Sequence, residues 1–417
     1  MAEGRHRISG VSLLPQRVAA VLLWLLGRLS ILALVGIDDY TVINDVAYYH
    51  RGITEGTLPE YPEPALWLLY PLHALFPGDA DMFTLAYVGL WLLLDVAFCL
   101  WLARGRHGAG LWFWLLFSTA CGPMLVFRMD LVPALLVGVA ALGVLHNSRI
   151  SAVALGYATA VKLWPGVLAA GLVAGWRERR TWRQLFWFLG TLLLSAAITA
   201  VFFGPDRVLS PLNYQGERGL QVESVAATPF VLLAWLQPDQ WQISYAPSKS
   251  FEIQGLGTGI AAQLCSVAML ALLLFAFGFA LRRFLRGGWH PHSTLAFWLV
   301  VLIALIVVNK VFSTQYLLWM GPLLAACLVG TAGREGGVPR PLKILTWLAI
   351  PTAALGTLVY PVFYDQLVDA DPQLIAVVIL SLRNIAMLGL LWQAIAWLRL
   401  ELRTEGKEHS RDKVHHP

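Results

Sequence analysis

Apolar runs of about 20 residues recur along this chain, and each is long enough to cross a hydrocarbon core of about 30 Å as a helix. Only 13% of the residues are charged and 58% are hydrophobic, whereas an ordinary soluble domain is roughly 25% charged. We therefore predict an all-α polytopic membrane protein. Residues 1–398 are expected to form a single membrane domain, and residues 399–417 a charged cytoplasmic tail.

The spacing of these runs predicts a bundle of about 10–12 transmembrane helices. The first run is longer than the apolar part of a signal peptide, contains Arg28, and is not followed by a small-residue cleavage site, so we expect it to remain as a span. The runs cover residues 18–37, 83–103, 110–127, 131–146, 150–176, 183–204, 257–281, 293–309, 313–330, 341–361 and 374–398.

Basic residues mark one side of the membrane. Positively charged loops stay in the cytoplasm, so we predict a multi-pass plasma-membrane protein with both termini cytoplasmic. The net charge of +5 then follows from these loops and gives no reason to expect a nucleic-acid partner. The basic connections are Arg104 and Arg106, Arg149, residues 177–183, Arg282, Arg283 and Arg286, and Arg334, Arg340 and Lys343.

The run 150–176 has basic flanks at both ends, so it must cross the membrane an even number of times. It is interrupted at Lys162–Pro165, where proline removes a helical hydrogen bond and disfavours helix at the preceding residue. Each arm is too short to span at about 1.5 Å per residue. We predict a hairpin of two short helices with Lys162 near its tip; the alternative is one kinked helix.

Two large loops, 38–82 and 205–256, are predicted on the outer face. Each contains an apolar piece too short to span, at 64–76 and 227–236, which we expect to form an interfacial helix. The first loop is strongly acidic and has Arg51 as its one basic residue. Its carboxylates are Asp38, Asp39, Asp45, Glu55, Glu60, Glu63, Asp79 and Asp81.

Asp45 is the first candidate for chemistry. It follows the first span closely and is surrounded by Tyr40, Tyr48 and Tyr49. Partial desolvation makes a carboxylate a better proton acceptor near neutral pH. The alternatives are a solvated loop aspartate or an N-cap for a helix over 46–54.

Lys162 is the second candidate, because an ammonium inside an apolar run faces a cavity and a partner. That partner could be a phosphate, or an internal carboxylate such as Asp95. Asp38 and Asp39 could bind a divalent cation or cap a helix. Arg128 and Asp130 share an outer turn, where they could pair with each other.

Further polar residues gather in the second outer loop and in a late outer turn. Arg218 can fork onto a phosphate or onto sugar hydroxyls, and Lys249 is expected on the same face. The remaining candidates for hydrogen bonding are Gln221, Glu223, Ser224, Lys310, Gln315 and Tyr316. Structural roles are an open alternative for all of them.

Several classes of site are excluded. The four cysteines lie inside apolar runs without CxxC spacing, and His50 and His73 lack metal-ligand spacing. No Walker loop and no dinucleotide fingerprint occurs. We therefore expect no metal and no cofactor.

Four passages together resemble glycosyltransferase family 87, the actinobacterial-type mannosyltransferases of the GT-C fold that use polyprenyl-phosphate-mannose. They are DVAYYHRGITEGTLPEYPEPALWLLYPL, ATAVKLWP, RGLQVES and VFSTQYLLWMGPLL. The chain departs from the family pattern at Tyr61-Pro62-Glu63-Pro64, and at Thr314, where proline is expected. These departures put acceptor choice in doubt, but they do not touch Asp45.

The resemblance implies a GT-C-like bundle with Asp45 as the catalytic carboxylate. It also implies transfer of a hexose, most simply mannose, from a polyprenyl-phosphate sugar to a lipid-linked glycan, with inversion. In our hypothesis the reaction occurs on the outer face among membrane lipids, and Lys162 and Arg218 stabilise the leaving phosphate. The expected substrate-binding set is Lys162, Arg218, Gln221, Glu223, Lys249, Lys310, Gln315, Tyr48 and Tyr61. A transporter or flippase for a lipid-linked sugar is the alternative.

Overall fold

The computed structural model describes residues 13–36, 39–105, 108–213 and 218–415. The structure is 77% helical. Within the described residues, eight helices are long and apolar enough to cross a membrane, and four shorter apolar helices accompany them. These findings confirm the prediction of an all-α polytopic membrane protein.

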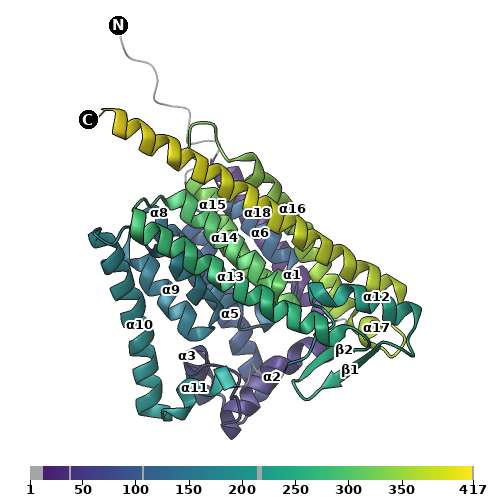
Figure 1. The fold of residues 1–417 in the computed structure, drawn as a ribbon. Helices are drawn as coiled ribbons and strands as arrows, with labels where there is room; N and C mark the ends of the chain where they lie inside the picture. Colours follow the sequence, from purple (N-terminus) through teal and green to yellow (C-terminus); the bar gives the residue numbers. More distant parts are fainter. Residues whose placement is uncertain (1–12, 37–38, 106–107, 214–217, 416–417) are drawn as a thin grey trace.

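The first half of the chain supplies the elements that surround the first outer loop and the hairpin (Figure 1). They are α1 (Leu13–Val35), α2 (Asp39–Glu55), α3 (Glu63–Leu66), α4 (Leu69–Leu75), α5 (Ala80–Leu102), α6 (Ala109–Ala120), α7 (Met124–Phe127), α8 (Leu131–Leu145), α9 (Arg149–Val161), the 3-10 helix η1 (Trp164–Leu172), α10 (Arg179–Phe203) and α11 (Asp206–Asn213).

The second half supplies the core of the bundle and the second outer loop. Its elements are η2 (Val225–Ala227), α12 (Thr228–Leu236), β1 (Gln242–Ala246), β2 (Ser250–Gln254), α13 (Thr258–Arg286), α14 (Pro291–Val308), η3 (Thr314–Trp319), α15 (Met320–Thr331), α16 (Arg340–Thr357), η4 (Leu358–Val362), α17 (Tyr364–Val368) and α18 (Leu374–His415).

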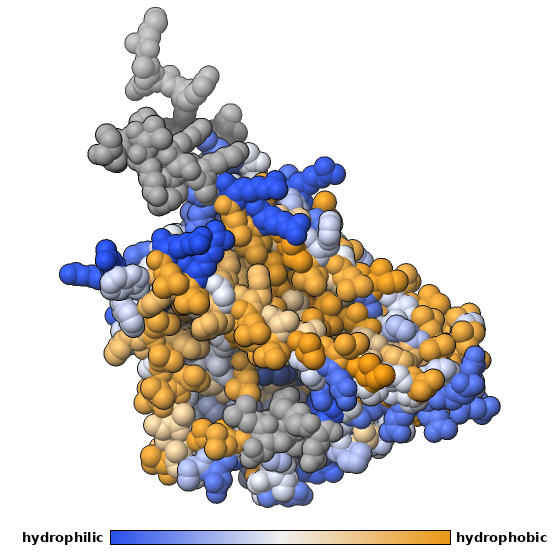
Figure 2. Space-filling model, viewed as in Figure 1, coloured by the Kyte–Doolittle hydropathy of each residue, from blue (hydrophilic) through white to orange (hydrophobic). Residues whose placement is uncertain are grey.

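Helices α14 and α15 form the centre of the bundle. They pack against each other, α15 also packs against α8 and α6, and α14 packs against α18. By contrast, α10 and α13 lie at the periphery and expose leucine and phenylalanine side chains along their length. Figure 2 shows the result as an apolar band between two hydrophilic ends. Such a band is what a bilayer-spanning surface requires.

The hairpin predicted over 150–176 is present. Its first arm is α9, Lys162 is extended at the tip, and η1 returns along α9. Both ends meet on one side, since Gln184 Nε2 donates to the Ser148 carbonyl at 3.3 Å. The return arm is a 3-10 helix, which rises about 2 Å per residue. The nine residues of η1 therefore extend over about the same axial length as the thirteen residues of α9.

The two apolar pieces of the outer loops are helical, as predicted. Residues 64–76 contain most of α3 and all of α4, and residues 227–236 contain all of α12. The second loop also contains an antiparallel hairpin of β1 and β2, in which Tyr245 pairs with Phe251. The all-α prediction missed this hairpin, because two five-residue strands carry too little alternation to stand out from a polar loop.

The basic connections lie together at one end of the bundle. The Trp176 amide donates to the Phe284 carbonyl at 3.0 Å, and Arg334 pairs with Glu401 at 2.7 Å. Helix α18 continues through residue 398 to His415, and the Glu401 side chain is buried beside Trp397. The domain boundary at residue 398 stays a prediction.

Candidate active site

Helix α2 carries Asp45 at the end of the bundle opposite the basic connections. Asp45, Tyr48 and Tyr49 are spaced three and four residues apart, so they share one face of the helix. Val46 and Tyr49 are buried and fix α2 against the bundle, while the Asp45 side chain remains 30% exposed. The helix begins at Asp39, so the alternative of Asp45 as an N-cap for 46–54 is wrong.

Arg128 holds Asp45 in an ion pair. Arg128 lies in the turn 128–130, between α7 and α8, and its Nη2 also donates to the Tyr360 hydroxyl at 3.0 Å. Trp91 Nε1 donates to the Arg128 carbonyl at 2.8 Å and fixes the backbone of the turn. The guanidinium therefore joins the first outer loop to the segment that follows α16.

Lys162 pairs with Asp130 from the same turn. Its Nζ lies 2.5 Å from Asp130 Oδ1, which also accepts from Trp319 Nε1 at 2.7 Å. The ammonium lies 5.1 Å from the ring centres of both Tyr316 and Trp319. Aromatic faces attract a cation at this range, so the tip of the hairpin is held by charge and by two rings.

Two expectations about these charges are wrong. Asp95 is not the partner of Lys162, since it is buried with Arg28 at 2.8 Å between α1 and α5. Arg128 and Asp130 do not pair with each other in the structure, because their side chains meet Asp45 and Lys162 instead. The turn 128–130 thus brings together the two residues that sequence analysis placed at the centre of the chemistry.

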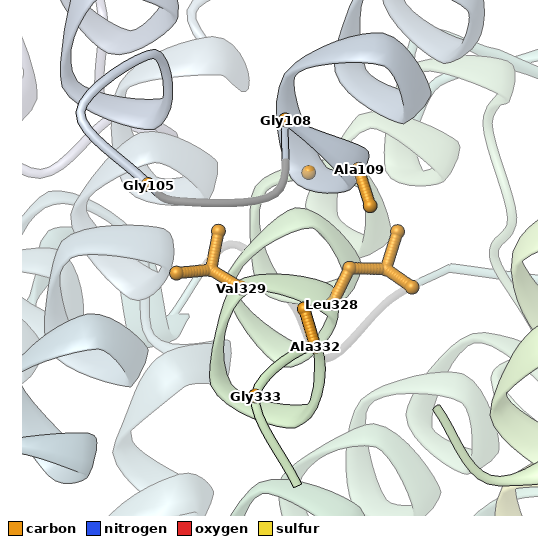
Figure 3. A pocket seen from close by; sticks show the side chains of 8 residues that line it. Gly105, Gly108, Ala109, Leu328, Val329, Ala332 and Gly333 are labelled. Carbon is orange, nitrogen blue, oxygen red and sulfur yellow. The ribbon is translucent and has the colours of Figure 1, made fainter. Parts of the chain in front are cut away.

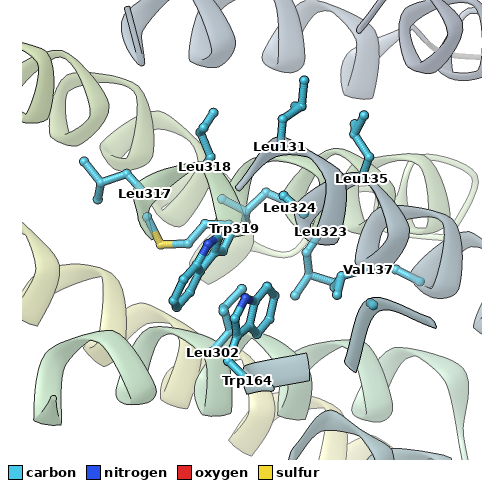
Figure 4. Packing of buried hydrophobic residues seen from close by; sticks show 14 of the residues in the cluster. Leu131, Leu135, Val137, Trp164, Leu302, Leu317, Leu318, Trp319, Leu323 and Leu324 are labelled. Atoms are coloured by element: carbon cyan, nitrogen blue, oxygen red, sulfur yellow. The ribbon is translucent and has the colours of Figure 1, made fainter. Parts of the chain in front are cut away.

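Stacked indole rings support the hairpin tip. Trp164, at the start of η1, lies parallel to Trp319, with ring centres 4.7 Å apart and planes 15° apart. Figure 4 shows the pair surrounded by Leu302, Leu323 and other buried side chains of α8, α14 and α15. This packing orients Trp319 Nε1 toward Asp130.

An aromatic cluster lines the region between Asp45 and the bundle. The rings of Tyr49 and Tyr61 meet edge to face at 5.4 Å, and Tyr87 stacks on Trp91 at 3.9 Å. Burial raises the pKa of Tyr49 and of Tyr61 well above the ordinary value, and the Asp130 charge raises both further. Their hydroxyls therefore stay protonated and can donate hydrogen bonds.

Tyr48 links α2 to the β-hairpin. Its hydroxyl donates to Glu60 and accepts from Lys249 Nζ at 3.0 Å. Burial is the main cause that raises the pKa of Tyr48, followed by the hydrogen bond to Glu60. The structure thus brings together Tyr48 of α2 and Lys249 of the turn between β1 and β2.

Glu223 is engaged inside the protein. Its Oε2 accepts from Arg383 Nη1 and from Thr314 Oγ1, both at 2.9 Å. The side chains of Glu223 and Arg383 are 4% and 0% exposed. Thr314, which departs from the family pattern, therefore supplies a hydroxyl that a proline could not. This cluster anchors the second outer loop to α18.

Other predicted substrate residues lie at or near the segment between α14 and η3. Gln221 donates from its amide to the Lys310 carbonyl and from Nε2 to Ser313 Oγ, both at 3.0 Å. Arg218 lies close enough to Tyr316 to act on it electrostatically, together with Lys162 and Asp130. Gln315 is half-buried beside Tyr316.

Arg207 of α11 organises the first outer loop. It pairs with Glu63 at 2.6 Å and donates to the carbonyls of Leu58 and Tyr61. Glu63 occupies the position where Tyr61-Pro62-Glu63-Pro64 departs from the family pattern. The extra carboxylate thus connects the two outer loops.

Among the described residues, no group of three or more potential ligands is arranged to hold a metal ion. A cation site was predicted at Asp38 and Asp39. Asp38 and the side chain of Asp39 lie outside the described part of the chain.

A separate cavity of about 360 Å³ lies between the start of α6 and the end of α15 (Figure 3). Both helices run twelve residues from it toward the Asp130 end, about 18 Å at 1.5 Å per residue. Gly105, Leu328 and Val329 are among its lining residues, which include no charged side chain among those described. It is therefore distinct from the site around Asp45.

The fold and the site define a multi-pass helical membrane protein with a charged, aromatic-lined site at one end of its bundle. Residues 60–217 match the model of glycosyltransferase family 87, which suggests glycosyltransferase activity. The matched segment contains the turn 128–130 and Lys162, whereas Asp45 precedes it. Neither the curated proteins nor the solved structures contain a match to this chain.

Proposed function

We propose that the protein transfers a hexose, most simply mannose, from a polyprenyl-phosphate donor to a lipid-linked glycan acceptor. The observation that supports this most is the turn 128–130, which contacts both Asp45 and Lys162. A carboxylate and an ammonium near one turn are the two charges that such a transfer needs. The family match over 60–217 supports the reaction class.

In this mechanism Asp45 accepts the proton of the acceptor hydroxyl while the hydroxyl oxygen attacks the anomeric carbon. The bond between that carbon and the phosphate oxygen breaks, and the stereochemistry inverts. Lys162 and Arg218 stabilise the charge that develops on the leaving phosphate. Fixed cations act most strongly on such charge when water is scarce, and the apolar rings of Tyr316 and Trp319 lie against Lys162.

The hairpin tip is also reachable from the lipid side. Leu163, next to Lys162, is 44% exposed, and η1 packs between the peripheral helices α10 and α13. The surface in Figure 2 is hollowed beneath α13, and hydrophilic side chains colour the inside of the hollow. A prenyl chain lying along the exposed apolar faces of α10 and α13 would bring its phosphate to the depth of Lys162.

The charge distribution supports an outer-facing site. The basic connections gather at the opposite end of the bundle, where Arg183 Nη2 donates to the Asn147 carbonyl at 3.2 Å. Because basic loops stay in the cytoplasm, Asp45 and the acidic first loop would face outward. The enzyme would then act on the outer face of the plasma membrane.

The rival function is a flippase or transporter for a lipid-linked sugar, which also needs cations and a cavity at membrane depth. Purified protein in liposomes, supplied with synthetic polyprenyl-phosphate-mannose and a membrane glycolipid extract, separates the two. Mass spectrometry should detect released polyprenyl phosphate together with a glycolipid heavier by one hexose. Relocation of intact donor without release would favour the flippase and contradict the proposal.

A further inference from the structure

Two hydrogen-bond donors converge on a single oxygen of Asp130. Lys162 Nζ lies 2.5 Å from Oδ1, and Trp319 Nε1 lies 2.7 Å from it. The Asp130 side chain is 7% exposed, whereas that of Lys162 is 33% exposed. Donors that converge on one negatively charged oxygen form the arrangement by which proteins bind phosphate and other oxyanions.

Both donors are packed against aromatic rings. Lys162 lies against the rings of Tyr316 and Trp319, and Trp319 is stacked on Trp164. Asp130 is the last residue of the turn 128–130, and a rotation of its side chain would vacate the position between the two donors. Any other anionic oxygen could then meet the same two donors.

We infer that Asp130 occupies the position of a phosphate oxygen in the substrate-free protein, and that the phosphate of a polyprenyl-phosphate donor displaces it. This inference rests on the proposed function and adds two roles to it. Trp319 becomes the second donor to the phosphate. Asp130 becomes a competing anion that lowers donor affinity and keeps Lys162 neutralised while the site is empty.

The displacement also connects the two halves of the site. Asp130 and Arg128 belong to the same three-residue turn, and Arg128 holds Asp45. Movement of the Asp130 side chain away from Lys162 therefore takes place two residues from the group that positions the proposed base. Donor binding would thus act on the turn that presents Asp45.

Equilibrium binding of farnesyl phosphate to the purified full-length protein in nanodiscs tests this inference without turnover. Asp130→Asn keeps an oxygen for Trp319 Nε1 but removes the competing charge. We expect it to lower the Kd by about tenfold, the order expected for removing one close like charge. Asp130→Glu retains the charge and should not tighten binding. Lys162→Ala should weaken it, and farnesol should not bind measurably at the same concentrations.

Two further variants test the second donor and provide a control. Trp319→Phe keeps an aromatic ring against Trp164 and removes the N–H donor, so it should weaken farnesyl phosphate binding. Glu401→Gln removes a buried carboxylate at the opposite end of the bundle and should leave the Kd unchanged. Thermal unfolding of each variant identifies any that fail to fold. If the Asp130 variants fail to fold, the Kd of Trp319→Phe decides whether the two donors bind the phosphate.

The outcomes separate this inference from the proposed function. Unchanged or weaker binding by Asp130→Asn, while Lys162→Ala still weakens binding, would overturn the role of Asp130 as a competitor and leave the phosphate site intact. Unchanged affinity in Trp319→Phe would remove Trp319 from the site. No binding of farnesyl phosphate to the wild-type protein would overturn both the inference and the proposed lipid-phosphate donor.

Discussion

The Arg128 guanidinium is ion-paired with the Asp45 carboxylate, although five helices, α3 to α7, separate the two residues in the chain. The same guanidinium donates to Tyr360, and the next charged residue, Asp130, binds Lys162. One short turn therefore contacts groups from α2, the α9–η1 hairpin and η4. This arrangement makes Arg128 a positioning residue for the proposed base.

Arg128→Gln should lower kcat and leave the KM for the donor within about twofold. The variant loses the charge that orients Asp45, and misplacing a catalytic group by about 1 Å can cost on the order of 100-fold. Steady-state transfer assays would show this split. Arg51 lies on α2, the helix that carries Asp45, and its side chain is exposed. Arg51→Gln is therefore the matched control and should behave as wild type. A wild-type kcat in Arg128→Gln would remove Arg128 from the mechanism.

Exchanging the charges of the hairpin pair tests whether Lys162 serves substrate or structure. The double variant Asp130→Lys with Lys162→Asp retains an ion pair at the same position but removes the acceptor for Trp319 Nε1. If Lys162 binds phosphate, the exchanged protein should lose donor use even where thermal unfolding shows that it is folded. Full activity in the exchanged protein would mean that the pair is structural.

The buried Glu223–Arg383 pair should matter for stability. Removing one partner of a buried ion pair costs about 3–5 kcal/mol, because the other charge is left unpaired. Glu223→Gln should therefore lower the unfolding temperature in detergent, and Arg383→Gln should do so by a similar amount. The double variant should be less damaging than the sum of the two, since neither charge is then left alone. An unaltered melting temperature in both single variants would contradict this account.

The Arg207 contacts predict a local effect on the first outer loop. Arg207→Gln removes the ion pair to Glu63 and the hydrogen bonds to the carbonyls of Leu58 and Tyr61. Hydrogen exchange should quicken over residues 58–66 and stay unchanged in α14 and α15. Arg177→Gln, on the opposite end of the bundle, provides the comparison. Protection over 58–66 that matches wild type would show that Arg207 does not order the loop.

The spans and the hairpin could be predicted because both follow from local rules. The length of an apolar run predicts a membrane helix. The break at Lys162–Pro165, between two basic flanks, predicts that the chain turns back to the side from which it came. The two short helical pieces at 64–76 and 227–236 could likewise be predicted from their apolar composition and length. The β1–β2 hairpin was missed, since two five-residue strands show too little alternation to stand out from a polar loop.

The partners of the charged residues could not be predicted. Arg128 and Asp130 looked like a local pair, because their neighbours across the bundle come from segments far away in the sequence. Arg383 and Tyr360 carried no motif at all, and their roles depend on tertiary packing against Glu223 and Arg128. The one available signal was a charge inside an apolar run, which predicts a partner without naming it.

Turnover by Asp45→Asn protein tests the central claim most directly. The assay follows release of polyprenyl phosphate from synthetic polyprenyl-phosphate-mannose by protein in nanodiscs, with Glu55→Gln at the end of the same helix as the control. We predict that Asp45→Asn folds, still binds farnesyl phosphate, and loses about 10²–10⁴-fold in kcat, the range expected when a general base is removed. Turnover close to wild type by folded Asp45→Asn protein would contradict the assignment of Asp45 as the base.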